Sequence, residues 1–292
     1  MSSAPTASRP TVGIVGLGLM GTAIATRFLE HGYPVVVWNR SADKAAPLVA
    51  RGAVWSDRPF AICQRVIISL YSSDVVATVI GQMQADLRPG QTVIDTTTGE
   101  PESAVAMNRQ LKQQGVDYLD APISGSSEQT RRGEALVMVG GESAVFQACA
   151  DLWSVLGRRV LYVGPSSSAA KLKLVTNLVL GLNRAALAEG LVYAQSLDID
   201  LSAALEVLRE SAAYSRTMDV KGPKMIAGDF SVQARLSQHL KDVRLILASA
   251  AAAGLSLPLS QTHRELLEQA EAAGHGELDN CAVIKAYGRK GE

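Results

Sequence analysis

The sequence has few aromatic residues and no excess of either charge, and both shortages narrow its possible functions. Aromatic residues make up 5% of the 292 residues, and 28 lysines and arginines balance 28 aspartates and glutamates. Proteins that bind nucleic acids usually carry a basic excess, a basic stripe or aromatic platforms that stack on bases. We therefore expect no nucleic-acid partner.

Cysteine is also scarce. Cys63, Cys149 and Cys281 lie far apart and lack the spacing of metal ligands. An odd number without a pattern predicts reduced thiols in a reducing compartment. The 4 histidines are scattered without spaced partners, so no metal is expected.

Long apolar runs are missing as well. No run approaches the roughly 18 residues that a membrane span needs. The segment Met1–Pro10 is polar and has no apolar core of a signal peptide. These observations predict a soluble, cytoplasmic protein with no membrane partner.

What the sequence does contain is apolar material for two modest domains, since hydrophobic residues make up 47%. From Thr11 to about Gly164, short β-branched runs alternate with helix-length amphipathic stretches, which predicts a mainly parallel sheet with helices on both faces. The strand-like runs are Val12–Val15, Val35–Trp38, Val66–Leu70, Thr92–Asp95, Tyr118–Asp120, Ala135–Val139 and Val160–Val163. The helix-like stretches include Ala23–Glu30, Val75–Met83 and Glu102–Gln114.

The character of the chain changes after Pro165. A nearly unbroken helical pattern runs from Ala169 to about Leu197, and everything beyond it also predicts helix. The later helical segments include Ser202–Leu208, Leu236–Ala252 and Arg264–Ala273. We therefore predict an α/β fold, with a doubly wound sheet in residues 1–164 and an all-α domain in residues 165–292, joined by a long interdomain helix.

One glycine-rich turn carries the first chemical signal. Gly16-Leu17-Gly18-Leu19-Met20-Gly21 follows the first predicted strand and opens the first predicted helix. The glycines permit a tight turn and a close approach to a pyrophosphate, which the N–H groups of the helix N-terminus can bind. A purely structural turn can carry the same residues, but the strand before it and the helix after it favour a Rossmann-type dinucleotide site.

The end of the second predicted strand indicates which dinucleotide binds. An NAD site would place Asp or Glu there to bind the ribose 2′-hydroxyl. The sequence instead has neutral Asn39, followed by Arg40 and Ser41, which suit a 2′-phosphate. The alternative is a solvated loop with incidental charge. We expect NADPH or NADP+ as the cofactor, bound in part by these three residues.

Three further motifs follow in order. They are Asp95-Thr96-Thr97-Thr98-Gly99-Glu100-Pro101, Asp120-Ala121-Pro122-Ile123-Ser124-Gly125-Ser126 and Lys171-Leu172-Lys173-Leu174-Val175-Thr176-Asn177. With the glycine turn, they resemble the β-hydroxyacid dehydrogenase family (3-hydroxyisobutyrate dehydrogenase-like), and within it most the glyoxylate and succinic semialdehyde reductases. The segments Lys221-Gly222-Pro223-Lys224, Phe230, Lys241-Asp242 and Gly276–Asp279 extend the resemblance over nearly the whole chain.

The resemblance implies a Rossmann-type NADP-binding domain followed by an all-helical substrate and dimerisation domain, with the substrate between them. The implied reaction is NADPH-dependent reduction of a small carboxylated aldehyde, such as glyoxylate or succinic semialdehyde, without a metal. Three alternatives stay open: an oxidative 3-hydroxyacid dehydrogenase, an NADPH-dependent imine reductase, and a non-catalytic NADP-binding protein. Lys173 counts against the imine reductase, which generally lacks that lysine. A homodimer or homotetramer is expected.

The resemblance also assigns the substrate residues. Lys173 would be the general acid, because a lysine whose pKa is lowered by burial can supply a proton near neutral pH. Lys173, rather than Lys171, stands four residues before Asn177 and so shares its helix face. Asn177 would orient the substrate. The carboxylate would be bound by Ser124, Gly125 and Ser126, and Phe230 would lie near the substrate. From residue type alone, an exposed lysine pair and a plain turn are the alternatives.

The remaining expected contacts are with the cofactor. Thr97 follows a strand end, where open α/β sheets hold their ligands. The resemblance implies that the middle of the cofactor is lined by Leu70, Tyr71 and Ser72. It also implies that Lys241 lies at the edge of the cofactor. From sequence alone, Lys241 could equally be a surface cation beside Asp242.

Overall fold

The computed structural model describes residues 9–287, so most of the predicted leaderless segment Met1–Pro10 lies outside the described residues. The chain divides into two compact units, one ending at Lys173 and one beginning at Leu174. We call them the sheet unit and the helical unit. The division falls inside helix α9 (Ser168–Ser196), whereas the sequence pattern predicts a domain boundary just before that helix.

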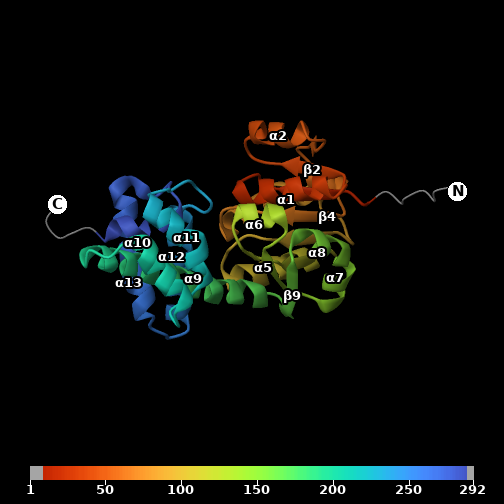
Figure 1. Ribbon diagram of the computed structural model, residues 1–292. Helices are drawn as coiled ribbons and strands as arrows, with labels where there is room; N and C mark the ends of the chain where they lie inside the picture. Colours follow the sequence, from red (N-terminus) through yellow and green to blue (C-terminus); the bar gives the residue numbers. More distant parts are fainter. Residues whose placement is uncertain (1–8, 288–292) are drawn as a thin grey trace. The chain divides into compact units, whose positions relative to one another are not determined.

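The sheet unit, which includes the labelled strands β2, β4 and β9 of Figure 1, is built on nine strands. Their order is β3-β2-β1-β4-β5-β6-β8-β7, with β9 paired to β8. The pairs from β3 to β6 and the β8–β9 pair are parallel, whereas β8 runs antiparallel to β6 and β7. The order reverses between β1 and β4, which is the point where open α/β sheets bind their ligands. The strands are β1 (Val12–Val15), β2 (Val35–Trp38), β3 (Val54–Trp55), β4 (Arg65–Ile68), β5 (Thr92–Asp95), β6 (Asp117–Asp120), β7 (Ile123–Ser124), β8 (Leu136–Gly140) and β9 (Arg159–Gly164).

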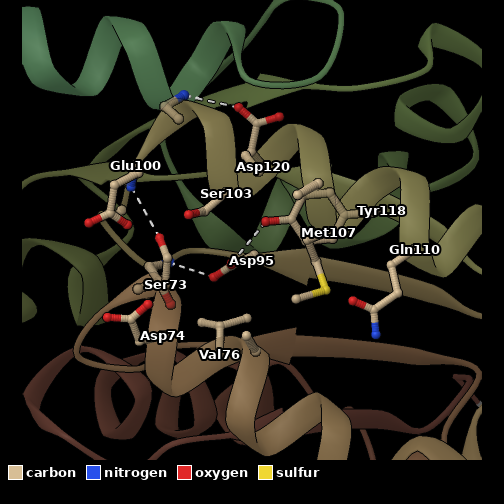
Figure 2. Close-up of a pocket in the computed structure, with 16 residues that line it drawn as sticks. Ser73, Asp74, Val76, Asp95, Glu100, Ser103, Met107, Gln110, Tyr118 and Asp120 are labelled. Atoms are coloured by element: carbon tan, nitrogen blue, oxygen red, sulfur yellow. Dashed lines mark hydrogen bonds between the residues drawn. The ribbon is translucent and has the colours of Figure 1, made fainter. Parts of the chain in front are cut away.

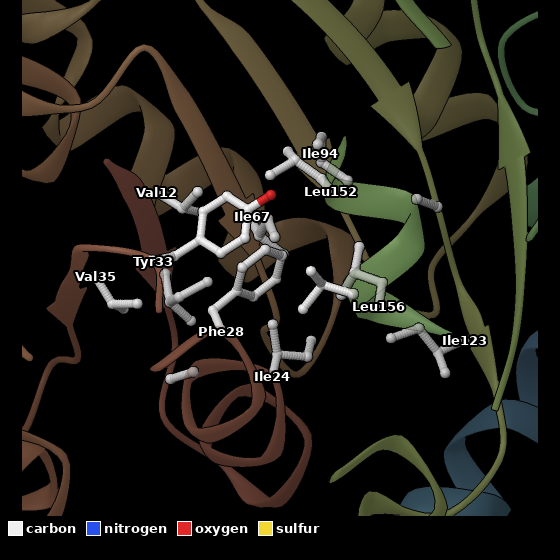
Figure 3. Packing of buried hydrophobic residues seen from close by; sticks show 14 of the residues in the cluster. Val12, Ile24, Phe28, Tyr33, Val35, Ile67, Ile94, Ile123, Leu152 and Leu156 are labelled. Atoms are coloured by element: carbon white, nitrogen blue, oxygen red, sulfur yellow. The ribbon is translucent and has the colours of Figure 1, made fainter. Parts of the chain in front are cut away.

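Successive residues of a strand point to opposite faces of the sheet, and in these strands the residues on both faces are apolar. Helices therefore cover both faces. On one face, α1 (Leu19–Glu30) and α8 (Ala150–Leu156) pack on the sheet; Figure 3 shows Phe28 of α1 and Leu152 of α8 near Ile67. On the other face, α3 (Pro59–Ile62), α4 (Ser73–Gln82) and α5 (Pro101–Lys112) pack on residues such as Ile68 and Val93. The predicted doubly wound sheet is confirmed.

Short elements complete the sheet unit. They are η1 (Ala42–Ala45), α2 (Ala46–Val49), η2 (Gln84–Asp86), α6 (Ser127–Arg132) and α7 (Ser143–Ala148). Helix α1 begins at Leu19, four residues before the predicted start at Ala23, because the glycine turn itself forms the first helical residues.

The helical unit contains the rest of α9 and a small all-α core. Its other helices are α10 (Leu201–Glu210), α11 (Arg216–Ala227), α12 (Leu236–Ala252), α13 (Pro258–Ala270), η3 (Glu271–His275) and η4 (Asn280–Ala286). Leucines and methionines of these helices, such as Leu205, Met225, Leu240 and Leu267, form one buried cluster. Within the described residues no strand follows β9, which agrees with the predicted all-helical part.

The three cysteines are all free and buried. Burial raises the pKa of the Cys63 thiol to about 12, so this thiol stays protonated at neutral pH. Within residues 9–287, no helix has the length and apolar character of a membrane span.

Candidate active site

The glycine turn has three glycines with three different environments. Gly16 has a φ of 97°, and a Cβ there would lie 2.2 Å from the carbonyl oxygen of Ser69. A Cβ on Gly21 would lie 1.8 Å from the carbonyl oxygen of Gly16. A Cβ on Gly18, at the start of α1, would have no atom within 4 Å. The first and third glycines are therefore required by the turn, whereas Gly18 leaves open space at a helix N-terminus, where a pyrophosphate fits.

Asn39 connects the glycine turn to the end of β2. Its Oδ1 accepts a hydrogen bond from the backbone N–H of Leu17 at 2.9 Å, and its Nδ2 donates to the carbonyl oxygen of Ser41 at 3.0 Å. A carboxylate at this position could not make the second bond. Arg40 and Ser41 follow it and are exposed. The side of the turn that would meet the ribose therefore carries a cation and no acidic side chain at position 39.

The loops after β4 and β5 are bound to each other. The N–H of Leu70 donates to Oγ1 of Thr97 at 3.1 Å, and the N–H of Thr97 donates to Oδ1 of Asp95 at 2.9 Å. Tyr71 is 55% exposed, and Ser72 stands at the N-terminus of α4. The structure thus brings the predicted cofactor residues of these two loops together at the carboxyl edge of the sheet.

Beneath these loops lies a cavity of about 150 Å³ between α4 and α5, with buried carboxylates in its wall (Figure 2). Asp95 and Asp120 are register partners at the ends of β5 and β6. Tyr118 donates its hydroxyl to Oδ2 of Asp95 at 2.9 Å. Burial raises the pKa of Asp95 to about 6 and also raises the pKa of Asp120 above its ordinary value. Both carboxylates lie in motifs singled out from the sequence, whereas Tyr118 was not among the predicted site residues.

Lys173 is placed beside the proposed carboxylate-binding segment. It is 8% exposed, and its Nζ donates to the carbonyl oxygen of Ile123 at 2.7 Å. Ser124 and Gly125 follow directly, the first half-buried and the second exposed. A Cβ on Gly125 would lie 2.9 Å from Cβ of Ala135, so close packing favours glycine there. A buried ammonium and a serine–glycine turn therefore lie together within the sheet unit.

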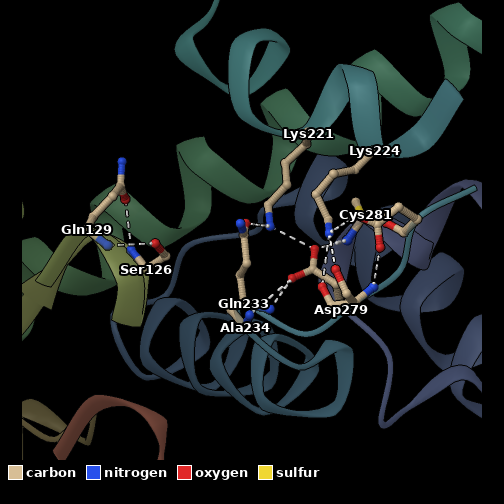
Figure 4. Close-up of polar contacts among 10 residues, drawn as sticks. Ser126, Gln129, Lys221, Lys224, Gln233, Ala234, Asp279 and Cys281 are labelled. Atoms are coloured by element: carbon tan, nitrogen blue, oxygen red, sulfur yellow. Dashed lines mark hydrogen bonds and ion pairs between the residues drawn. The ribbon is translucent and has the colours of Figure 1, made fainter. Parts of the chain in front are cut away.

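Ser126 has a structural role that the sequence analysis did not include. Its Oγ accepts a hydrogen bond from the N–H of Gln129 at 3.2 Å, and Oε1 of Gln129 accepts one from the N–H of Ser126 at 2.9 Å (Figure 4). This capping box starts α6. The hydroxyl oxygen is therefore engaged in the cap, while its O–H can still donate.

The helical unit brings together three of the residues singled out from the sequence. Nδ2 of Asn177 donates to Oδ2 of Asp242 at 2.9 Å, and Nζ of Lys241 lies 3.1 Å from Oδ1 of the same carboxylate. Phe230 makes a separate contact, in which Nζ of Lys285 lies 4.8 Å from the centre of the Phe230 ring. Asp242 thus sets the orientation of the Asn177 amide, which the sequence analysis did not foresee.

The Lys-Gly-Pro-Lys segment serves the helical core. Nζ of Lys221 lies 2.7 Å from Oδ1 of Asp279, whose other oxygen accepts the N–H groups of Gln233 and Ala234 (Figure 4). Asp279 is 0% exposed; its burial raises its pKa, but Lys221 and the backbone donors lower it more, so the carboxylate stays ionised. This buried ion pair joins α11 to η4.

Comparison with known proteins agrees with this arrangement over almost the whole chain. The family model for the NAD-binding domain of 6-phosphogluconate dehydrogenase matches residues 11–164. The model for the NAD-binding region of NADP-dependent 3-hydroxyisobutyrate dehydrogenase matches residues 167–287.

Individual relatives agree with the family models. The chain is 30% identical over 281 residues to glyoxylate/succinic semialdehyde reductase 1 of Arabidopsis thaliana, covering 94% of this chain and 97% of that protein. The crystal structure of 3-hydroxyisobutyrate dehydrogenase from Salmonella typhimurium superposes with a TM-score of 0.88 at 27% identity, covering 96% of this chain and 100% of that one. Psf3 in complex with NADP+ and 2-OPP superposes with a TM-score of 0.87 at 29% identity, covering 95% and 100%.

The glycine turn, the parallel sheet and the helical second unit define a nicotinamide-dependent oxidoreductase. The chain belongs to the β-hydroxyacid dehydrogenase family. It is an NAD(P)-dependent hydroxyacid dehydrogenase or reductase, acting on the CH–OH group of its substrate or on the matching carbonyl.

Proposed function

We propose that this enzyme uses NADPH to reduce a small carboxylated aldehyde of the glyoxylate or succinic semialdehyde type. The observation that carries the proposal is the place of Lys173. Its buried ammonium lies 2.7 Å from the carbonyl oxygen of Ile123 and so next to Ser124 and Gly125. A proton donor beside a small anion-binding turn suits a substrate that has a carbonyl and a carboxylate close together.

The proposed cofactor residues follow the geometry of the sheet edge. The N–H groups at the start of α1, together with the open space at Gly18, would hold the pyrophosphate. The exposed side chains of Arg40 and Ser41 would hold a 2′-phosphate, which favours NADPH over NADH. The nicotinamide half would lie along two loops, the one after β4 with Leu70, Tyr71 and Ser72 and the one after β5 with Thr97. Lys241 would lie at the edge of the cofactor. When bound, NADPH supplies the hydride for the carbonyl carbon.

The proposed mechanism assigns the remaining steps to the chain. Nζ of Lys173 donates one proton to the carbonyl oxygen as it gains charge, and the neutral amine then takes a proton from water. The carbonyl oxygen of Ile123 accepts one N–H of the Lys173 side chain and so limits the directions in which its other N–H bonds point. Ser124, Gly125 and the O–H of Ser126 hold the carboxylate. The amide of Asn177, oriented by Asp242, binds a substrate oxygen.

The names of known relatives support the proposed substrate class. A relative with 30% identity and nearly full coverage is named as a glyoxylate/succinic semialdehyde reductase. Another, from Eubacterium barkeri, is a 2-(hydroxymethyl)glutarate dehydrogenase, whose name also denotes a carboxylated alcohol. A carboxylate on the substrate is the feature that these names share.

The proposal is tested by NADPH oxidation at 340 nm with pairs of aldehydes of equal length. Glyoxylate is compared with acetaldehyde, and succinic semialdehyde with butanal, each with NADPH and with NADH. We expect the carboxylated member of one pair to have a kcat/KM at least about 100-fold higher, because unmatched polar groups in the site reject the analogue. We also expect NADPH to be preferred. Oxidation of NADPH by no aldehyde, or equal turnover within both pairs, would refute the proposal.

A further inference from the structure

The carboxylate of Asp120 holds the first turn of α9. Its Oδ1 accepts the N–H of Ser167 at 2.8 Å, and its Oδ2 accepts the N–H of Ala170 at 2.9 Å. The first N–H groups of a helix have no partner within the helix, and a negative charge at this end is favourable. Both oxygens of one carboxylate thus bind backbone donors at the start of the helix that carries Lys173.

This contact is deeply built into the sheet unit. Asp120 is 3% exposed and appears in the wall of the cavity in Figure 2. A Cβ on Gly140 would lie 2.7 Å from Oδ1 of Asp120, so β8 leaves room for the carboxylate only because it has glycine there. Ser167 has a φ of 75°, which is costly for a residue with a side chain. Its hydrogen bond to Asp120 helps to keep the backbone in that conformation.

The same short segment also contacts Lys173 itself. Asp120 and Ile123 lie three residues apart, at the corner between β6 and β7. Asp120 binds the start of α9, and the carbonyl of Ile123 accepts the hydrogen bond from Nζ of Lys173 one turn further along the helix. The corner therefore fixes both the helix backbone and the end of the lysine side chain.

We propose that Asp120 is a positioning residue for Lys173: by fixing the first turn of α9, it aims the ammonium at the substrate carbonyl. This inference rests on the proposed function, in which Lys173 donates the proton. Asp120 itself touches no reacting atom. Its effect is on proton transfer, because a displacement of about 1 Å in a catalytic group can lower the rate on the order of 100-fold.

The test is Asp120→Asn, which keeps the size of the side chain but can accept only one of the two backbone donors. We expect kcat per active site to fall about 10- to 100-fold, while KM for NADPH changes less than about 2-fold, because the glycine turn is not involved. The solvent deuterium isotope effect on kcat should rise, because proton transfer becomes slower. Active sites are counted by titration with NADPH, so that unfolded protein does not lower the measured kcat.

Asp86→Asn is the matched control. Asp86 is also a largely buried aspartate of the sheet unit, at 8% exposure, but it binds Arg58 away from the site. Its kcat and isotope effect should equal those of the wild type. Asp120→Glu keeps both acceptors on a longer side chain, so its kcat per site should lie between those of the wild type and Asp120→Asn, with an isotope effect above the wild-type value. It serves as the test variant if Asp120→Asn does not fold, and a lower kcat without a rise in the isotope effect would then overturn the proposal.

Two results separate this inference from the function on which it rests. If Lys173→Ala abolishes turnover but Asp120→Asn has the wild-type kcat per site and isotope effect, Asp120 only stabilises the helix and this inference is wrong. If Lys173→Ala turns over like the wild type, the proposed proton donor is wrong, and the positioning role is overturned with it.

Discussion

At the scale of single residues, the candidate site contains charged side chains that are buried, which is unusual for such groups. The ammonium of Lys173 and the carboxylates of Asp95 and Asp120 are all less than 9% exposed. Each contacts the backbone of a neighbouring segment: Lys173 that of Ile123, and the two aspartates that of loop and helix starts. Buried charges are retained when such bonds offset their loss of hydration, and they cluster at functional sites.

Asp95 should make the stability of the protein fall as pH rises from about 4 to about 6. Burial raises the pKa of its carboxyl from 3.8 to about 6 in the folded state. Between these values the folded state holds more protons than the unfolded state, so the free energy of unfolding decreases with pH, by at most about 3 kcal/mol in all. Asp95→Asn should remove this component.

The measurement is urea unfolding of the wild type and Asp95→Asn at several pH values from 4 to 7. The difference in unfolding free energy, wild type minus variant, should decline through this range and level off above it. A difference that is constant with pH would show that the carboxyl titrates normally.

Arg184 is a second buried charge, in the helical unit, and it has a cost. It is 3% exposed, and its Nε and Nη1 find no hydrogen-bond partner anywhere in residues 9–287. Burial lowers its pKa to about 10, more than the charge of Asp279 raises it. Arg184→Met should therefore raise the free energy of unfolding by about 1 to 3 kcal/mol. Exposed Arg132→Met is the control and should change it by less than about 0.5 kcal/mol. Destabilisation by Arg184→Met would mean that the guanidinium is well paired in solution.

At the scale of elements, two glycines at the start of the first helix have different roles: one is needed for folding and the other for cofactor binding. A Cβ on Gly21 would meet the carbonyl oxygen of Gly16 at 1.8 Å, whereas one on Gly18 would meet nothing within 4 Å. Gly21→Ala should therefore destabilise the protein without cofactor by about 2 kcal/mol or more, and Gly18→Val should not. Gly18→Val should instead weaken NADPH binding at least about 10-fold, because it fills the place of the pyrophosphate.

Thermal unfolding without cofactor and NADPH titration by fluorescence check both halves of this prediction. The account fails if Gly18→Val lowers the melting temperature as much as Gly21→Ala while binding NADPH normally. That pattern would assign Gly18 to the turn and leave the open space beside it without a role.

Elements with a clear apolar period were predictable from the sequence. Strands β1, β2 and β5 and helix α12 have the predicted bounds, because the three strands are short β-branched runs of four residues and the helix has a long apolar pattern at helical spacing. Strands β3 and β7 have two residues each, too few for any period, and exist only because neighbouring strands pair with them. Helix α11 lies in a region predicted to be helical, but no bounds of its own were predicted for it. Pro223 within it has no N–H for the carbonyl of Asp219.

The candidate site was predictable in part for a related reason. The glycine turn and the Lys173 motif are local in sequence and could be found there. The contacts of Asp120 with Ser167 and Ala170 join residues 47 and 50 positions apart, and the capping role of Ser126 depends on a helix too short to predict. Burial and partners of this kind depend on tertiary packing, which no local pattern specifies.

At the scale of the whole molecule, helix α9 carries the proposed proton donor and the proposed substrate amide. Lys173 is the last residue of the sheet unit, and Asn177 lies one helical turn later, in the helical unit. The amide is oriented by Asp242 of α12, whereas the ammonium contacts Ile123 of the sheet unit. Each of these two residues is therefore held in place by contacts within its own unit.

The most direct test of the central claim is the single-turnover rate of NADPH oxidation by the preferred carboxylated aldehyde in Lys173→Ala, with Lys171→Ala as the matched control. Lys171 is on the same turn of α9 but exposed. The account predicts that Lys173→Ala lowers the rate by a factor on the order of 100 to 10,000, with NADPH binding unchanged, whereas Lys171→Ala keeps the wild-type rate. Equal rates in both variants and the wild type would contradict it.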